Sequence, residues 1–413
     1  MKPSQPRLSS VRPFSADFWL NIGTCMVAGA AISVLFQKVY PYCADFPAYF
    51  NDCLRGMGGG AAAGLLLNYL HGQIPHAWRI QPMLTGFIRL FLAWTMLQYG
   101  GGKVIPLQFP QLMANMESTF LEMPPQRVAW TFFGYSTHYQ MFLGWVETIP
   151  AFLLLFRRTY LFGALLMVPV LVNVVAVNIF FDVCVKVNSS IYLVTAIFLL
   201  VNEHRRLVPV FFTGKAAPPV ARTVLFENPR ANRIAGIFHG LLVTAILGTV
   251  AQNYWEGYHF NQQQYAKSPV YGCWLVDDMK HFRDTAFVDV PHDDSLFVDR
   301  VYFQGFVGVF KGKGRWDRYR FEVDSLRQEL NIKLISQYQP PVQRTWQYHL
   351  PDSLHLSLSG RLWDDSVQMH CRLRRGGSQD LLYLNQITGV PTGWLHCLWS
   401  HTSYHLLFKP FES

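Results

Sequence analysis

Charged residues are scarce in this 413-residue chain: 15% are Asp, Glu, Lys or Arg, whereas soluble domains average about 25%. Hydrophobic residues make up 51%, and the mean hydropathy is +0.14. This combination excludes a disordered, collagen-like or coiled-coil protein and argues against an ordinary cytosolic enzyme. The seven cysteines include no Cys-x-x-Cys pair, which excludes the common zinc ribbons and thioredoxin-like redox motifs.

Motifs of the best-known enzyme classes are also missing. The chain has no GxxxxGK[ST] phosphate loop, no GxGxxG after a soluble strand, no HExxH and no GxSxG. The net charge of +9 comes from the apolar half, because residues 1–254 hold 18 basic and 9 acidic residues while residues 255–413 hold 17 of each. A nucleic-acid partner would need that charge on a soluble face. We therefore expect neither a nucleic-acid partner nor a metal site.

Seven apolar stretches approach the roughly 20 residues that a helix needs to cross a bilayer. The second contains four glycines within residues 56–60, and the sixth is short, so we expect six or seven spans. The stretches are Phe18–Val39, Leu54–Leu70, Met83–Tyr99, Tyr139–Phe156, Tyr160–Phe181, Ser189–Val201 and Ile234–Gln252.

The loops between these spans set the expected orientation. With a cytoplasmic N-terminus, twelve basic residues lie in inside loops and only Lys103, Arg127 and Lys186 in outside loops of this region. The N-terminal segment has no small-residue cleavage site after its apolar run, so we expect an uncleaved anchor. Cys43 and Cys53 would then face an oxidising compartment, where they form a disulfide or stay free as buried thiols.

After Tyr254 the apolar runs stop and apolar residues alternate with polar ones, which is typical of strands with one buried face. Short strands at regular spacing predict an antiparallel β-barrel or sandwich. The Gly-x-Trp at 272–274 is also common at the first strand of lipocalin-like barrels, and a packed interior is favoured over a ligand cavity. The alternating runs are 296–303, 318–323, 330–335, 354–358 and 367–373.

Two ionisable residues lie in the middle of predicted spans: Arg89 in the third and Glu147 in the fourth. Charges inside a bilayer are costly, so each is a functional candidate. An Arg–carboxylate pair between neighbouring helices would lower the cost of both. Such a pair would either form a proton-linked or quinone-headgroup site, or simply fix the helix register as a structural ion pair.

A second group of polar residues lies near the predicted outer ends of the spans. Lys103 closes the third span, Asp182 and Lys186 follow the fifth, and Asn173 and Asn178 lie within the fifth. These residues are candidates for one shallow pocket near the membrane surface. The alternative is that the charged side chains reach toward water and the asparagines bond between helices.

Residues 83–208 combine several short motifs. They are Arg89 in the span before Gly100 and Lys103, the mid-span Glu147, the basic pair Arg157–Arg158 before another apolar helix, the segment Trp130–Ser136, and Phe181-Asp182-Val183 through Lys186. Together these features resemble the DoxX-like membrane family, in its longer form with extra spans and a C-terminal β domain.

The resemblance implies a four-helix unit, residues 83–208, in a bacterial inner membrane. With the spans and the orientation given above, the chain divides into an N-terminal anchor with one or two spans (1–82), this unit (83–208), a cytoplasmic loop and last span (209–254), and a periplasmic or otherwise extracytoplasmic β domain (255–413). Some members of the family are subunits of quinone-linked oxidoreductases, so quinone is the cofactor that it implies. The tail after Gln386 departs from the pattern of the relatives.

Two functions fit these observations. Because no catalytic constellation is visible, we favour an accessory or binding subunit of a larger membrane complex, with the lipid bilayer and other subunits as its partners. The many tryptophans of the β domain agree with a binding surface. The alternative is a membrane subunit of a quinone-linked oxidoreductase that uses Arg89 and Glu147. Whether the chain is an enzyme is left open by the sequence.

Overall fold

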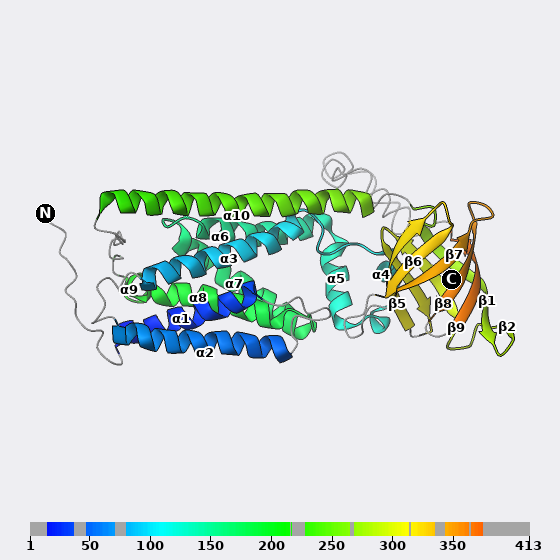
Figure 1. The fold of residues 1–413 in the computed structure, drawn as a ribbon, viewed down its shortest axis with the longest axis horizontal. Coiled ribbons are helices and arrows are strands. Elements are labelled where there is room, and N and C mark those ends of the chain that lie inside the picture. The colour runs from blue at the N-terminus through cyan, green and yellow to red at the C-terminus, as the bar shows by residue number, and fades with distance from the viewer. Residues whose placement is uncertain are drawn as a thin grey trace, which may run out of the picture. The chain divides into compact units, whose positions relative to one another are not determined.

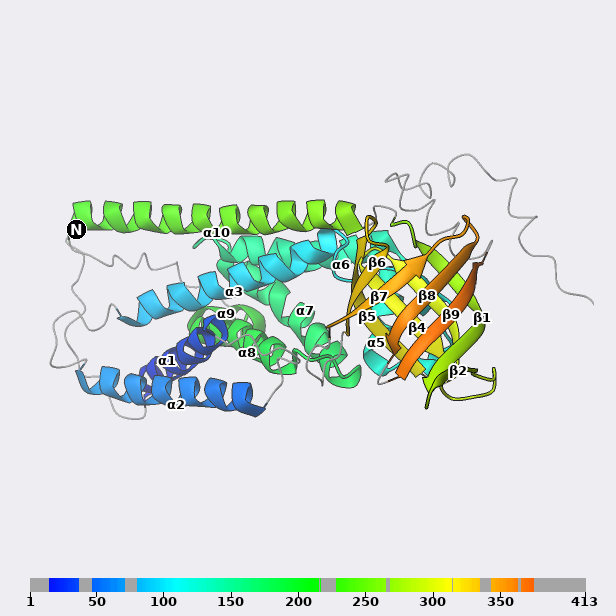
Figure 2. The same ribbon diagram turned by 45° about the vertical axis from the view of Figure 1, so that its right-hand side comes forward.

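A computed structural model describes residues 15–36, 47–70, 80–214, 216, 228–264, 268–313, 315–334, 343–362 and 365–374. Cys43 and the tail after Gln386 lie outside these residues. The described chain divides into a helical unit, residues 15–110 and 123–263, and a barrel unit, residues 111–122 and 264–374. Figures 1 and 2 show the helices of the one unit and the strands of the other.

Every predicted span coincides with a helix of the helical unit. The helices are α1 (Ala16–Leu35), α2 (Pro47–Leu70), α3 (Ile80–Val104), α5 (Pro125–Tyr135), α6 (Thr137–Leu154), α7 (Tyr160–Phe180), α8 (Lys186–Asn202), α9 (His204–Phe212) and α10 (Pro229–Gln264). Four of them, α1, α3, α7 and α10, are long and apolar enough to cross a membrane. The length and composition of these four helices are those of a membrane protein.

Helices α3, α6, α7 and α8 contact one another in a ring, and α1 packs against α2, α3 and α8. Local sequence sets where some of these helices begin. Ser15 accepts a hydrogen bond from the backbone N–H of Phe18 at the start of α1, and Ser136 does the same for Tyr139 at the start of α6. These N-caps satisfy donors that the first helical turn would otherwise leave unpaired.

The glycines of α2 explain why a poor helix former is a good span. Gly56 and Gly60 lie against the backbone of α1, where an added Cβ would come within 2.1 Å of Ser33 Oγ and 2.2 Å of the Cys25 carbonyl oxygen. Gly59 faces open space. Glycines spaced by four residues allow two membrane helices to approach closely, so the composition that weakens the helix by itself strengthens the helix pair.

The barrel unit is a closed antiparallel barrel of eight strands, as predicted, and not a sandwich. Strand β1 pairs with both β3 and β9, which closes the sheet, while β2 forms a hairpin that extends β1. The strands are β1 (Gly272–Arg283), β2 (Ala286–Asp289), β3 (Val298–Gln304), β4 (Val307–Gly312), β5 (Arg315–Asp324), β6 (Glu329–Leu334), β7 (Gln343–His349), β8 (His355–Leu362) and β9 (Asp365–Leu373).

Large side chains fill the barrel interior. Trp274, Trp346 and Phe303 are at most 2% exposed and belong to one continuous apolar core. Trp274, in the predicted Gly-x-Trp, also donates its Nε1–H to the carbonyl oxygen of Val270, 2.8 Å away. The packed core that the sequence favoured is therefore present around these residues, in a barrel of the lipocalin-like, up-and-down type.

A segment from the middle of the sequence covers part of the barrel's outer surface. It contains α4 (Met113–Met116) and the short helix η2 (Phe120–Glu122). Gln304 of β3 accepts a hydrogen bond from the N–H of Met113 and donates one to the carbonyl of Gln111, both at 2.8 Å. Residues 111–122 thus belong to the barrel unit although 150 residues separate them from the first strand, and the sequence boundary at residue 255 misses them.

Candidate functional site

A buried ion pair joins α3 to α6. The Nζ of Lys103 lies 2.8 Å from Oε1 and 2.6 Å from Oε2 of Glu147, and the two side chains are 8% and 5% exposed. Glycines bring the two helices together at this level: a Cβ on Gly100 would lie 2.4 Å from Thr148 Oγ1, and one on Gly144 would lie 2.5 Å from the backbone nitrogen of Val104. The close approach excludes water from the pair.

Tyrosines and an asparagine surround this pair. Tyr49 of α2 donates a hydrogen bond to the side-chain oxygen of Asn188 on α8. Tyr99 of α3 lies within hydrogen-bonding reach of both Asn188 and Tyr192 and interacts electrostatically with Glu147. We call these six residues, Tyr49, Tyr99, Lys103, Glu147, Asn188 and Tyr192, the Lys–Glu cluster.

The chemistry of the Lys–Glu cluster follows from its burial. Removing two charges from water is costly, and the attraction between them compensates only when the geometry is good and the remaining groups are bonded. Both carboxylate oxygens of Glu147 contact the ammonium group of Lys103, so this requirement is met. Such a cluster can lock four helices together, or it can pass a proton between a carboxylate and neighbouring phenols.

Arg89 is not part of this cluster, so the expected Arg89–Glu147 pair is wrong. Arg89 precedes Lys103 by 14 residues on α3, which places the two Cα atoms about 21 Å apart along the helix. Its guanidinium group instead lies over the ring of Tyr160 on α7, 5.7 Å from the ring centroid. The sequence identified Glu147 as a buried charge but assigned it the wrong partner.

The remaining residues of the predicted pocket are also divided. Lys186 pairs with Asp182 at 2.7 Å, and the Asp182 side chain is 69% exposed. Asp182 follows α7 and adopts a left-handed backbone conformation with φ of 51°. At the same helix end, the carbonyl oxygen of Asn178 accepts a hydrogen bond from the N–H of Val183. Asn178 is buried and Asn173 is exposed. Lys103 and Lys186 thus belong to two separate ion pairs.

Of the two alternatives for Cys53, the disulfide with Cys43 is wrong, because Cys53 is a free and buried thiol. Cys184, between α7 and α8, is disulfide-bonded instead. The alternative that the sequence left open for Cys53, a buried thiol, is the correct one. Within the described ranges, no three His, Cys, Asp or Glu side chains come together as metal ligands.

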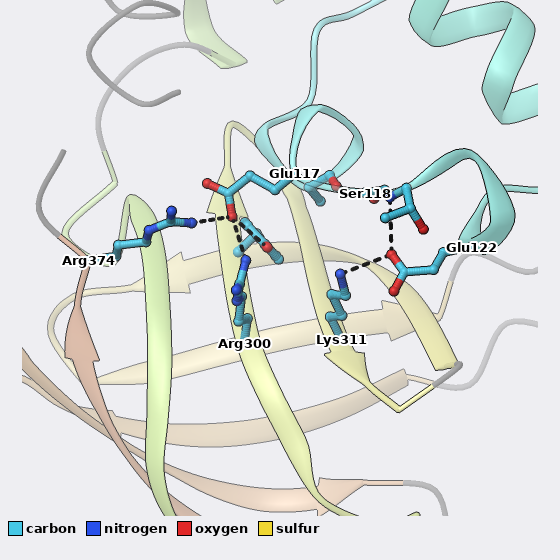
Figure 3. A network of polar contacts seen from close by, with 9 residues as sticks. Glu117, Ser118, Glu122, Arg300, Lys311 and Arg374 are labelled. Carbon is cyan, nitrogen blue, oxygen red and sulfur yellow. Dashed lines mark hydrogen bonds and ion pairs between the residues drawn. The ribbon is translucent and has the colours of Figure 1, made fainter. Parts of the chain in front are cut away.

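The barrel unit has its own charged cluster, which sequence analysis did not find. Glu117, 11% exposed, accepts hydrogen bonds at Oε2 from Arg300 (3.0 Å) and Tyr302 (2.9 Å). The same oxygen forms an ion pair with Nη1 of Arg374 at 2.8 Å, and Figure 3 shows both arginines around it. A hydrogen bond to Tyr302 raises the pKa of Arg300, and burial raises the pKa of Tyr302. The cluster clamps the 111–122 segment to strand β3 and to the end of β9.

The comparisons with known proteins identify a relative but no activity. No family model matches the chain, and no solved structure matches it. The uncharacterized protein YwoB of Bacillus subtilis (strain 168) is 36% identical over 132 residues, which are 32% of this chain and 84% of YwoB. Because so much of YwoB is matched at this identity, the chain belongs to the same protein family as YwoB.

Proposed function

We propose that the protein is an accessory, binding subunit of a larger membrane-protein complex. In this proposal α3, α6, α7 and α8 form a DoxX-like four-helix unit, α1, α2 and α10 bring the number of spans to seven, and the barrel contacts a partner. The ring of contacts among α3, α6, α7 and α8 supports the four-helix unit. Residues 83–208, which carry the resemblance, contain α6, α7, α8 and all of α3 except its first three residues.

The state of the Lys–Glu cluster carries the proposal. Glu147 is bonded to Lys103 at both oxygens, and Asn188 is bonded to Tyr49. The first bond joins α3 to α6 and the second joins α2 to α8, which is what a structural lock requires. A barrel whose core is filled by Trp274 and Trp346 likewise offers its outer surface rather than an interior site.

We further propose that the protein lies in a bacterial inner membrane with a cytoplasmic N-terminus and a periplasmic barrel. The distribution of basic residues supports this orientation, because twelve lie in the proposed inside loops and three in the outside loops. The disulfide at Cys184 supports it independently. It lies in the loop between α7 and α8, which this orientation exposes to the periplasm, where disulfides persist.

The test is purification of the tagged full-length chain from native membranes in a mild detergent, with mass spectrometry of every co-purifying protein. We expect a partner protein to co-purify in constant stoichiometry. The same partner should still co-purify when Lys103 and Glu147 are both replaced by apolar residues of similar size. Recovery of the chain alone, in a form that turns over quinol, would overturn it.

A second candidate function is supported by a pair of phenols that begins at Glu147. Tyr99 interacts electrostatically with Glu147 and its ring lies 5.8 Å from the ring of Tyr192, an arrangement that could carry protons to a quinone bound by a partner subunit. In that case a Glu147→Gln variant that keeps its assembled state loses quinone-dependent turnover. Unchanged turnover in the assembled variant excludes this function and leaves the first.

A further inference from the structure

A cavity of about 920 Å³ lies between α3 and α10 in the helical unit. Apolar side chains line most of it, from Met83, Phe87 and Trp94 on α3 and from Ala235, Leu242 and Ile246 on α10. Helix α10 is largely exposed along its length, and Val250 is its buried position among the side chains that are described. The cavity is therefore an opening beside an apolar helix that faces the proposed lipid.

Three basic side chains contribute to the same cavity. Arg89 is 5% exposed, lines the cavity and has an Nε that makes no hydrogen bond. Arg157 and His239 also line it, and both interact electrostatically with Arg89. The lining residues include no Asp or Glu. Among the described residues, the cavity thus holds positive charge without a carboxylate partner.

The surrounding charges do not neutralise Arg89. Arg89 lies over the ring of Tyr160, and the hydroxyl group of Tyr160 donates a hydrogen bond to Glu203. Arg206 donates a hydrogen bond of 3.2 Å to the other carboxylate oxygen of Glu203. Glu203 is therefore already engaged. An isolated guanidinium group in an apolar environment is costly, and an anion with several oxygens is the ligand that best offsets this cost, because guanidinium groups bind such oxygens in pairs.

The length of the cavity indicates what is attached to the anion. The lining of α10 runs from Ala231 to Thr249, and its part beyond His239 covers ten residues or about 15 Å. This equals half of the roughly 30 Å hydrocarbon core of a bilayer. On α3 the lining ends at Trp94, beyond Arg89 in the same direction along the helical unit. The space matches one acyl chain that extends from a head group held at the arginines.

We propose that this cavity binds a membrane phospholipid with an anionic head group. The phosphate contacts Arg89 and Arg157, His239 lies beside it, and one acyl chain follows α3 and α10 toward Trp94 and Thr249. A zwitterionic lipid is disfavoured, because the lining offers no carboxylate for a choline or ethanolamine group. The site is separate from the Lys–Glu cluster, so this inference does not depend on the proposed function.

Trp94 provides a direct test. The full-length protein is reconstituted in phosphatidylcholine nanodiscs, and its tryptophan fluorescence is measured. One series of nanodiscs contains increasing fractions of brominated phosphatidylglycerol, and a second series contains increasing fractions of brominated phosphatidylcholine. The signal of Trp94 is the difference between the unaltered protein and a Trp94→Phe variant. We expect half-maximal quenching of Trp94 at a fraction of brominated phosphatidylglycerol at least tenfold lower than that of brominated phosphatidylcholine.

Matched variants locate the effect. Arg89→Gln should abolish the preference for phosphatidylglycerol, while Arg158→Gln, an exposed neighbour of Arg157 outside the cavity, should leave it unchanged. Ala235→Phe fills the cavity without removing a charge and should also abolish the preference. Gly236→Phe on the open face of α10 is its control. The Ala235 pair keeps the test valid if Arg89→Gln does not fold.

Three results would overturn the proposal. They are equal quenching of Trp94 by the two brominated lipids, a preference that survives in both Arg89→Gln and Ala235→Phe, and displacement of brominated phosphatidylglycerol by stoichiometric isoprenoid quinone. The last result would assign the cavity to a neutral redox lipid. Loss of the preference in these variants without loss of co-purifying partners separates this site from the proposed function.

Discussion

The helical unit and the barrel unit place their charged and their bulky side chains in opposite ways. In the helical unit a Lys–Glu pair lies inside, with side chains 8% and 5% exposed, and glycines form the closest helix contact. In the barrel unit Trp274 and Trp346 lie inside. The Arg300 and Arg374 side chains that bind Glu117 lie at the outer surface and are 33% and 36% exposed.

The difference follows from the surroundings of each unit. Water drives apolar side chains into a barrel core, so large aromatic residues stabilise the barrel unit most. Lipid gives no comparable force between helices, because an apolar helix surface is as well solvated by lipid chains as by another helix. The helical unit therefore depends on close backbone contacts and on polar groups that bond inside it. Four predictions test this comparison.

The largest effect is expected for Glu147→Gln. The variant removes the carboxylate charge and leaves the Lys103 ammonium buried among helices, so unfolding should become easier by about 3–5 kcal/mol. The measurement is thermal or SDS-induced unfolding of the purified chain in detergent. A change below about 1 kcal/mol would show that water reaches the pair and that the helical unit does not depend on it.

The double variant Lys103→Met with Glu147→Leu is the control for this prediction. It replaces both charged groups by apolar side chains of similar size, which often costs little or even stabilises a protein. Its stability should therefore lie closer to that of the unaltered protein than to that of Glu147→Gln. If the double variant is as unstable as the single one, the loss of the Glu147 contacts themselves, and not the unpaired lysine, explains the effect.

The Lys–Glu pair also shows what sequence could and could not predict. Apolar runs of about 20 residues predicted α1, α2, α3, α6, α7, α8 and α10, and alternation with a period of two predicted five strands, β3, β5, β6, β8 and β9, because both patterns arise from the chain's local geometry. The partner of Glu147 was missed because Arg89 and Lys103 lie only about 40° apart around α3, so their helical face does not distinguish them.

Depth in the bilayer distinguishes the two residues, and depth depends on where the helices begin and end. Helix α3 extends to Val104, five residues beyond the predicted end of its span, so the level of Glu147 on α6 meets the end of α3 and not its middle. The facing glycines Gly100 and Gly144 were the available signal for this level. The Glu117 cluster could not be predicted at all, because Glu117 is more than 180 residues from each of its partners.

The second prediction compares two neighbouring glycines of α2. Gly60→Leu places a side chain against the Cys25 carbonyl and the backbone of α1, which cannot move aside without separating the helices. We expect a loss of about 3 kcal/mol, the upper end for overpacking. Gly59→Leu points into open space and should be neutral or slightly stabilising, because leucine is the better helix former. Equal losses in both variants would contradict the close contact of α1 and α2.

The third prediction concerns the clamp of the barrel unit. Glu117→Gln removes the charge that holds Arg300 and Arg374, but both arginines are exposed enough to be solvated by water. We expect a loss of about 2 kcal/mol, smaller than for Glu147→Gln. The loss should shrink in 1 M salt, where the Debye length is about 3 Å, while the effect of Glu147→Gln should not change. Equal salt dependence of the two variants would contradict the proposed difference in burial.

The smallest effect is expected at the ion pair between Glu122 and Lys311, whose Oε2–Nζ distance is 3.1 Å. Burial alone would raise the pKa of Glu122, but the hydrogen bonds from Lys311 and the N–H of Thr119, with the charges of Lys311 and Arg300, outweigh burial and lower it. A carboxyl group whose pKa is lower in the folded state stabilises the fold above its unfolded pKa of about 4.3 and loses this contribution as the pH falls through the folded value. The unfolding free energies of the unaltered protein and of Glu122→Gln should therefore differ by less than about 1 kcal/mol at pH 7 and converge below pH 4.

Other carboxyl groups titrate in the same pH range as Glu122. One of them is Asp352, because its hydrogen bond with His355 lowers its pKa. For this reason only the difference between the two proteins reports on Glu122. A difference that stays constant down to pH 3 would show that Glu122 contributes through packing and not through its charge.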